Sequence, residues 1–351
     1  MQLSLKLIAI MLFFIIIISC KKDDNTTNNP IQAYNQSDLY GTWIRHSLVT
    51  SSNNTGYWIH GSESINAATT TLNVTLANGS WDTTYATPSI LVSSSGVITA
   101  TYDAAAHSFL NVNKNLIVGT TKRGQSYTLI VDQKTVPGTI YSASDLQGIW
   151  LSHYLVTGGG LWSGWIHSKS TIDNNGNCTV SEVVKSDGNT NTSSAAFSIS
   201  SSGVISVNGL ATYNGFLSPD KQLMLTNLTD GGGGSGLAVS QKLVPGTTYS
   251  KADLNGKWQF YNLLVGSENW TEHGIMTIDI NGNAVISDVV KDNGDTFINP
   301  GIIPMSITSD GVLTFGADFH GFLGADKKTI FATMGDDSGN AYCFLVILKM
   351  P

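Results

Sequence analysis

The sequence predicts an all-β protein built from three tandem copies of a small antiparallel β-barrel module. Three observations lead to this prediction. One ten-residue motif occurs three times at nearly constant spacing, short apolar runs alternate with turn residues, and no segment has helix-length periodicity. The composition agrees, because only 12 % of the 351 residues are charged, whereas 41 % are hydrophobic and 36 are glycine.

The repeated motif reads YNQSDLYGTW at 34–43, YSASDLQGIW at 141–150 and YSKADLNGKW at 249–258. Each copy later closes on an apolar segment that carries a lysine. The distance from the motif tryptophan to that lysine is 91, 92 and 91 residues in the three copies. Two markers that stay in register over three copies indicate tandem duplication of one folding unit.

The three β modules are expected to span residues 34–136, 137–244 and 245–351. Short Val-Pro-Gly-Thr links join them, so neighbouring modules should touch. The Ser and Asp residues ahead of each Gly-x-Trp predict a single helical turn before the first strand.

Turn formers divide each module into seven or eight short strand-like runs, as Asn281-Gly282 and Asp310-Gly311 do in the third copy. The final run, 342–348, is apolar without alternation, so it should be buried on both faces and packed against a neighbour. Three sparse cysteines give no disulfide framework, and Cys178 and Cys343 are therefore expected to be core thiols.

A Gly-x-Trp at the start of the first strand, with a cation late in the last strand, resembles the lipocalin pattern. In that family the Trp plugs one end of the barrel and a basic side chain from the closing strand lies across it in a cation–π contact. The resemblance assigns this structural barrel motif to Gly41, Trp43, Lys134, Gly148, Trp150, Lys242, Gly256, Trp258 and Lys349.

Two alternatives stay open at this point. Each module is shorter than a typical lipocalin and uses Lys in place of Arg, so a barrel filled by its own side chains competes with one that holds a ligand. The rival fold is a six-bladed β-propeller in which each repeat supplies two four-stranded blades.

The N-terminus carries an uncharged apolar run from Leu7 to Ile18, which has 12 residues. A membrane-spanning helix needs about 20, so the run predicts a signal-peptide core. It ends in Ile17-Ile18-Ser19-Cys20, which resembles the lipobox of bacterial lipoproteins. The resemblance implies a signal peptide at 1–19 and a lipid anchor on Cys20.

Residues 20–33 have almost no apolar side chains and are expected to form a disordered tether. Their Lys21-Lys22-Asp23-Asp24 resembles the export signal that sends some Gram-negative lipoproteins to the cell surface. We therefore expect an outer-membrane, lipid-anchored protein at the cell surface, with a periplasm-facing location as the alternative.

A second aromatic marker recurs as a Trp followed by a His in each copy. Residues two apart on a strand share a face, so such a pair could form a pocket wall, or it could simply pack in the core or at the rim. In the third copy one extra residue would turn the His away from the Trp unless a β-bulge absorbs it. The candidate binding residues are Trp58, His60, Trp165, His167, Trp270 and His273.

The remaining patterns argue against several function classes. The net charge of −7 and the dispersed basic residues argue against a nucleic-acid-binding surface, which needs clustered Lys and Arg. No nucleophile elbow, His-Glu-x-x-His, phosphate loop or metal-ligand spacing occurs, so we expect no enzyme, cofactor or metal. The sequence favours a non-catalytic binding module for a small molecule, glycan or protein partner, with a structural envelope protein of filled barrels as the alternative. The oligomeric state is left open.

Overall fold

Antiparallel strands make up nearly all the regular structure of the described residues, and a single helical turn precedes the first strand of each module. The computed structural model describes residues 34–351 apart from 52–54, 77–81, 89, 102, 159–162, 191, 193, 294, 296–299, 317 and 336–340. Residues 34–351 form one compact unit. The expected signal peptide, the tether and Cys20 lie outside the described residues. Among the described residues, no helix combines the length and apolarity needed to cross a membrane.

The first module is a nine-stranded sheet in which the first and last strands are neighbours. Its order is β4-β3-β2-β1-β9-β8-β7-β6-β5, so β4 and β5 form the two edges. The elements are η1 (Gln36–Asp38), β1 (Gly41–Ser51), β2 (Gly56–Ile65), β3 (Thr69–Leu76), β4 (Asp82–Pro88), β5 (Leu91–Val92), β6 (Val97–Thr99), β7 (His107–Leu110), β8 (Leu116–Arg123) and β9 (Ser126–Lys134).

The second module is a closed eight-stranded barrel of consecutive strands, in which the last strand pairs with the first. Its elements are α2 (Ala143–Leu146), β10 (Gly148–Thr157), β11 (Gly164–Ile172), β12 (Asn177–Lys185), β13 (Ser194–Ile199), β14 (Val204–Val207), β15 (Leu210–Leu217), β16 (Leu223–Thr229) and β17 (Ser235–Leu243).

The third module repeats the nine-stranded order of the first, with β21 and β22 at its edges. Its elements are α3 (Lys251–Leu254), β18 (Gly256–Gly266), β19 (Trp270–Ile278), β20 (Asn283–Lys291), β21 (Ile303–Pro304), β22 (Ser306–Ile307), β23 (Val312–Thr314), β24 (Phe319–Leu323), β25 (Thr329–Gly335) and β26 (Ala341–Lys349).

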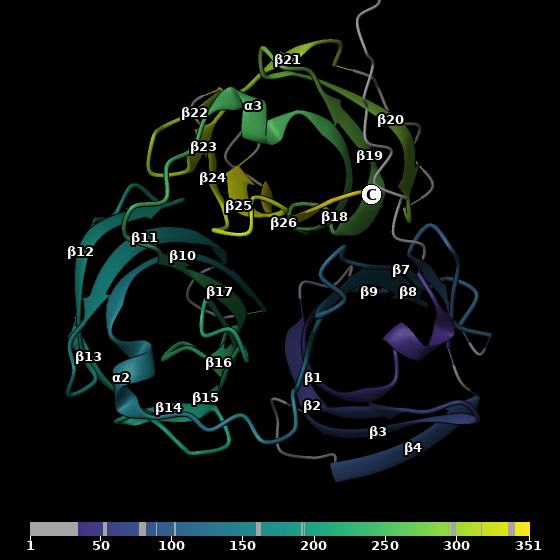
Figure 1. Ribbon diagram of the computed structural model, residues 1–351, viewed down its shortest axis with the longest axis horizontal. Coiled ribbons are helices and arrows are strands. Elements are labelled where there is room, and N and C mark those ends of the chain that lie inside the picture. Colours follow the sequence, from purple (N-terminus) through teal and green to yellow (C-terminus); the bar gives the residue numbers. More distant parts are fainter. Residues whose placement is uncertain are drawn as a thin grey trace, which may run out of the picture. The chain divides into compact units, whose positions relative to one another are not determined.

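The prediction of an all-β fold with three barrel-like modules is confirmed, and the described sheets are not the four-stranded blades of a propeller (Figure 1). The strand count is corrected to nine in the first and third modules. There the additional strand arises because β4 and β5, or β21 and β22, are separate strands that lie at opposite edges of the sheet. In the third module the break between β21 and β22 follows Pro304, which has no N–H to continue a hydrogen-bonded ladder.

Each barrel is closed at one end by its motif tryptophan, which is fully buried. The indole N–H donates to the carbonyl of the residue four positions earlier, at 2.7–2.8 Å in all three copies. The ammonium of the lysine on the last strand lies over the indole ring. The distance from Nζ to the ring centroid is 5.1 Å for Lys134–Trp43, 5.3 Å for Lys242–Trp150 and 5.2 Å for Lys349–Trp258.

The motif glycine is required for this closure on two grounds. Gly41, Gly148 and Gly256 have φ of +127°, +139° and +131°, a region that side chains rarely adopt. A Cβ at Gly148 would also stand 2.7 Å from Cε of Lys242, the atom next to the charged nitrogen. The structure thus places all nine residues of the expected barrel motif together at the closed ends.

A second lysine reinforces each closed end, and the sequence reasoning missed it. Lys114, Lys221 and Lys327 occupy turns with φ of +57°, +62° and +55°. Each ammonium group forms a salt bridge at 2.8–3.0 Å with the aspartate of the helical turn, which is Asp38, Asp145 or Asp253. It also lies over the ring of the first motif residue, which is Tyr34, Tyr141 or Tyr249. The available signal was a Lys that recurs at one position of a turn in all three copies.

The modules contact one another in a cyclic order. The first two strands of each module lie against late strands of the next: β1 and β2 against β16 and β17, β10 and β11 against β25 and β26, and β18 and β19 against β8 and β9. One apolar cluster draws buried residues from all three modules, among them Leu48, Leu155 and Leu263. The ring of contacts is therefore closed, and the short links suffice because neighbours touch.

The last strand shows how one segment serves two cores. Phe344, Val346 and Leu348 of β26 belong to the shared cluster, whereas Cys343 and Ile347 belong to the interior cluster of the third module. This arrangement explains the unbroken apolar run, and it confirms burial on both faces. Cys343 and Cys178 are both buried free thiols.

Candidate functional site: a cavity inside the first module

The structure places the expected Trp/His surface inside the contacts between modules. Trp58 and His60 lie on β2 opposite Leu48 and His46. Trp58 is only 4 % exposed, and its indole N–H donates at 3.0 Å to Oγ1 of Thr229 in the second module. His46 and His60 lie with their ring centroids 4.7 Å apart. This pair is committed to packing and cannot also form an open pocket wall.

The second copy behaves in the same way. The rings of Trp165 and His167 lie 5.0 Å and 5.3 Å from that of His320, which belongs to the third module. His153, which pairs with His167 across the strands, has Nδ1 3.3 Å from Oγ1 of Thr333. The interface between the second and third modules is thus lined by three imidazoles.

In the third copy a register shift between His273 and Ile275 accommodates the extra residue. Thr271 stands opposite Leu263, the position that Trp58 and Trp165 hold in the other copies. His273 keeps the equivalent place and stacks on His107 of the first module, with ring centroids 4.1 Å apart. Trp270 is the residue displaced, so the packing interpretation fits all three copies.

The cavity that remains lies inside the first barrel and has a volume of about 510 Å³. Its middle is apolar, with side chains from β2, β3, β6, β8 and β9 such as Ile59, Val74, Ile98 and Ile130. Charged side chains stand at its two ends. This combination of apolar walls with a few placed polar groups is typical of small-molecule sites.

The inner end of the cavity holds a buried ion cluster. Arg45 Nε and Nη2 donate to the two carboxylate oxygens of Asp132 at 2.9 and 2.7 Å, and Nη2 also donates to Glu63 at 2.9 Å. The two carboxylates are each only 1 % exposed. Burial raises the pKa of Glu63 to about 7, and the neighbouring Asp132 adds to the rise while Arg45 opposes it.

The outer end carries a second pair near the β8–β9 hairpin. Arg123 donates through Nε and Nη2 to Asp103 at 3.0 and 2.8 Å, and Thr121 donates to the same carboxylate oxygen. Arg123 is 68 % exposed, whereas Asp103 is 9 % exposed. Tyr57 also reaches this end, so the cavity runs from the buried cluster to the solvent side of the barrel.

The three repeats differ in chemistry at the positions of this ion cluster. Strand register aligns the motif tryptophans and the residues beside them, so equivalent positions can be read directly. They are charged in the first module, hydroxyl-bearing in the second and apolar in the third: Arg45, Ser152 and Phe260; Glu63, Ser170 and Met276; Asp132, Ser240 and Ile347.

The repeats also differ in volume, which explains why the first barrel is hollow. Ser47 stands where the second module has Tyr154, and Ala106 where it has Tyr213. In the second module Gly236 makes room for the Tyr154 ring, because a Cβ there would lie 2.2 Å from it. The third barrel is filled by a cluster that includes Phe260 and Phe319.

Sequence reasoning missed this site, although a signal existed. Arg45 follows Trp43 by two residues and Asp132 precedes Lys134 by two, so each shares the inward face of its marker. The available signal was that the positions of Arg45 and Asp132 carry inward-facing charges in the first copy and in neither of the other two. In the described part of the chain, no group of three metal-ligating side chains occurs.

Comparisons with known proteins found similar solved structures but no match at the level of sequence. No protein-family model matches the chain, and no curated protein matches it. Transferrin-binding protein B of Neisseria meningitidis serogroup B is 8 % identical at a TM-score of 0.30, covering 88 % of this chain and 76 % of that one. A protein of unknown function from Nostoc punctiforme, of the DUF3598 family, is 12 % identical at 0.23, covering 90 % and 97 %.

Kievitone hydratase of Nectria haematococca is 11 % identical at a TM-score of 0.20, covering 92 % of this chain and 94 % of that one. At these identities and TM-scores, none of the three proteins assigns an activity to this chain.

Proposed function

We propose that this protein is a non-catalytic binding protein whose first module takes up a small, mainly apolar molecule with a cationic or hydrogen-bond-donating head. The observation that supports the proposal is the cavity of about 510 Å³ with the Arg45–Glu63–Asp132 cluster at its inner end. Within the described residues, the other two barrels are packed by their own side chains.

The charges of the lining favour a donor-bearing head. Two arginines, Arg45 and Arg123, face three carboxylates, Glu63, Asp103 and Asp132. When Glu63 is ionised the lining has an excess of one negative charge, held in a region of low dielectric. An ammonium group would offset that charge, whereas a carboxylate would add to it.

The second and third modules, by this proposal, hold the first in place. In these two copies the interiors are filled by side chains, so their role is structural and they bind no small ligand. Their strands close the ring of contacts around the shared apolar cluster. We also propose that Cys20 carries the lipid, that the protein is attached to the outer membrane and that it faces the cell exterior, as the lipobox and the Lys21-Lys22-Asp23-Asp24 segment of the tether support.

Replacing the buried ion cluster by serines tests whether the cavity binds a ligand through its charges. The triple variant Arg45→Ser, Glu63→Ser and Asp132→Ser copies the residues of the second module and leaves no buried charge unpaired. We measure binding of three matched dansyl-alkyl probes, an amine, an alcohol and a carboxylate, by fluorescence. The wild type should bind the amine at least tenfold more tightly than the carboxylate, because the excess charge of the lining is negative, and the triple variant should lose this preference.

Ser152→Ala, a change inside the second barrel, is the control and should leave all three affinities unchanged. For the wild type, amine affinity should fall as the pH drops from 8 to 6, because Glu63 takes up a proton with a pKa of about 7. Failure of all three probes to bind, or an unaltered preference in the triple variant, would contradict the proposal.

The anchor is tested separately with Cys20→Ala. Removal of the thiol removes the acceptor for the lipid, so the protein should move from the membrane pellet to the soluble fraction while its thermal unfolding stays the same. The fractions are compared by immunoblot after a high-salt wash. A variant that still pellets with membranes would show that another segment attaches the protein.

A further inference from the structure

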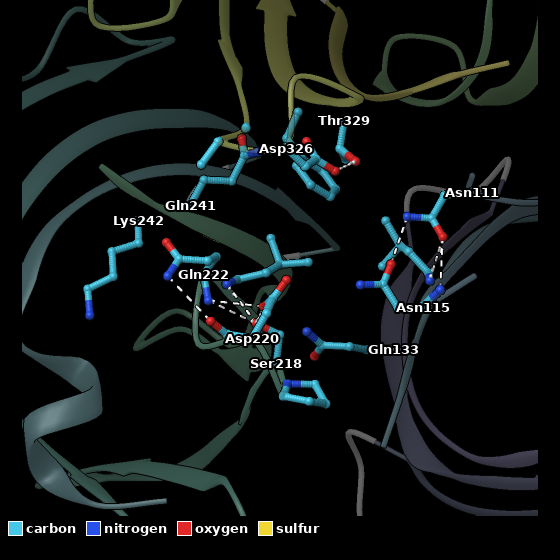
Figure 2. Close-up of a pocket in the computed structure, with 16 residues that line it drawn as sticks. Asn111, Asn115, Gln133, Ser218, Asp220, Gln222, Gln241, Lys242, Asp326 and Thr329 are labelled. Carbon is cyan, nitrogen blue, oxygen red and sulfur yellow. Dashed lines mark hydrogen bonds between the residues drawn. The ribbon is translucent and has the colours of Figure 1, made fainter. Parts of the chain in front are cut away.

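A second pocket lies where the three modules meet, outside the cavity of the first barrel. It has a volume of about 160 Å³ and is lined by the turns and strand ends of β8 and β9, of β16 and β17, and of β24 and β25 (Figure 2). Each module contributes polar side chains to it, for example Asn115, Gln222 and Thr329. The pocket therefore exists only because the ring of modules is closed.

Gln133 is the side chain that distinguishes this pocket. It comes from β9, is 2 % exposed and points from the first module toward Ser218 (Figure 2). Within the described residues, neither its amide nitrogen nor its amide oxygen has a hydrogen-bond partner, and the amide oxygen of Gln222 is in the same state. Buried polar groups in proteins are almost always hydrogen-bonded, so these atoms call for a partner from outside the chain.

The internal repeats show that such an amide is not needed for folding. Strand register places Gln241 of the second module and Leu348 of the third at the position of Gln133. The third module offers partners to both atoms of the Gln241 amide: in the amide orientation that pairs donor with acceptor, the nitrogen lies 3.1 Å from the Phe322 carbonyl and the oxygen 3.3 Å from the Gly324 N–H. Leu348 is buried in the shared apolar cluster. Of the three residues at this strand position, Gln133 alone is an amide with neither atom hydrogen-bonded among the described residues.

We propose that this pocket binds a small neutral polyhydroxylated molecule, of the class of monosaccharides and cyclic polyols. An amide presents a donor and an acceptor side by side, and a pair of neighbouring hydroxyl groups matches both. The apolar side chains of Leu116, Leu223 and Phe331 also line the pocket and suit the C–H face of a sugar ring. The volume corresponds to about five water molecules at about 30 Å³ each, which such a ring would displace.

Other ligand classes fit less well. The carboxylates of Asp220 and Asp326 stand at the pocket, and Lys242, which also lines it, directs its ammonium group to the Asp145 carbonyl, so an anion is disfavoured. Both carboxylates already accept hydrogen bonds from their own turns. A hard cation takes six or more oxygen ligands, and the described residues offer no group of three acidic, histidine or cysteine side chains for one.

The test uses the full chain in detergent and a panel of glucose, galactose, mannose, ribose, myo-inositol and glycerol, read by calorimetry and by saturation-transfer NMR. At least one ring compound of the panel should bind with a dissociation constant below about 10 mM, which marks the weak end of specific binding. Gln133→Leu, which copies the third module, should weaken that binding at least tenfold. Its melting temperature without ligand should equal or exceed that of the wild type, because a buried unpaired amide is removed.

Gln147→Leu is the matched control, since Gln147 is exposed and does not line the pocket, and it should bind as the wild type does. The proposal is overturned if no compound of the panel binds, if Gln133→Leu binds normally, or if calcium chloride alone produces the signal. Because Gln133 is not part of the first-barrel cavity, the dansyl-amine affinity of Gln133→Leu should be unchanged. The outcomes for the two sites are therefore distinguishable.

Discussion

Replacing Trp150 by alanine should lower the free energy of unfolding of the three-module unit by about 3–5 kcal/mol, the range for a large aromatic side chain lost from a core. Trp150 is completely buried in the interior cluster of the second module. The substitution leaves a cavity at the closed end of the barrel. It also removes the indole donor from the Leu146 carbonyl and the ring beneath Lys242.

The same loss should extend to the whole unit, because the three modules share one apolar cluster and close a ring of contacts. Urea unfolding followed by far-UV circular dichroism should show one transition moved to lower urea. A separate early transition, in which the second module unfolds while the others persist, would contradict the cooperative ring.

Lys242→Met provides the matched control for the cation. Methionine keeps most of the apolar stem but loses the charge over Trp150 and the donor to the Asp145 carbonyl. The expected loss is about 1 kcal/mol, well below that of the tryptophan change. If the two variants lose equal stability, the ammonium group and not the buried ring closes the barrel.

Acidification from pH 7 to pH 4.5 should destabilise the protein by at least about 3 kcal/mol, through the histidines between the modules. The sequence has seven histidines. Six contact another module directly, in the pairs His46–Asn227, His107–His273, His153–Thr333 and His167–His320. The seventh, His60, lies against His46.

Burial lowers the imidazole pKa of His46, His60, His153, His167, His273 and His320. The pKa falls to about 4 for His60, His167 and His273, and well below the ordinary value of 6.5 for His46 and His153. Nearby imidazoles lower the pKa further for most of them, since protonation would bring like charges together.

The sign of the effect follows from linkage. A histidine whose folded pKa is depressed binds its proton more readily in the unfolded chain. Each such histidine therefore makes its full contribution to the free energy of unfolding above pH 6.5. That contribution is lost as the pH falls from 6.5 toward about 4. Three carboxyl groups act in the opposite direction, because burial raises the pKa of Glu63 to about 7 and also raises the pKa values of Glu272 and Asp326, but they stand against at least five histidines.

The third module supplies the variant for this test. Tyr261 holds the position of His46 and His153 there. His153→Tyr should therefore fold and should flatten the dependence of the urea midpoint on pH between 7 and 4.5. Asn255→Gln, a change on an exposed residue at the end of α3 that adds no titratable group, is the control and should keep the wild-type slope. A wild-type midpoint that does not move with pH would contradict the assignment.

The sequence alone determined the fold class and the modular plan. The Gly-x-Trp motif and the late lysine predicted that first and last strands pair, and Trp43 indeed stands opposite Lys134 in the strand register. These features are local or repeat in register, so periodicity and spacing carry them. The lipobox likewise depends on a short contiguous pattern, although Cys20 lies outside the described residues.

Only the tertiary structure decided which faces are interior and which lie between modules. Trp58 and His60 share a strand face, as expected, but that face meets a neighbouring module 171 residues away in sequence at Thr229. No local pattern encodes such a contact. Whether a barrel is hollow was also undecided, because it depends on the summed volume of inward residues from many strands, with Ser47 and Ala106 in one copy where Tyr154 and Tyr213 fill another.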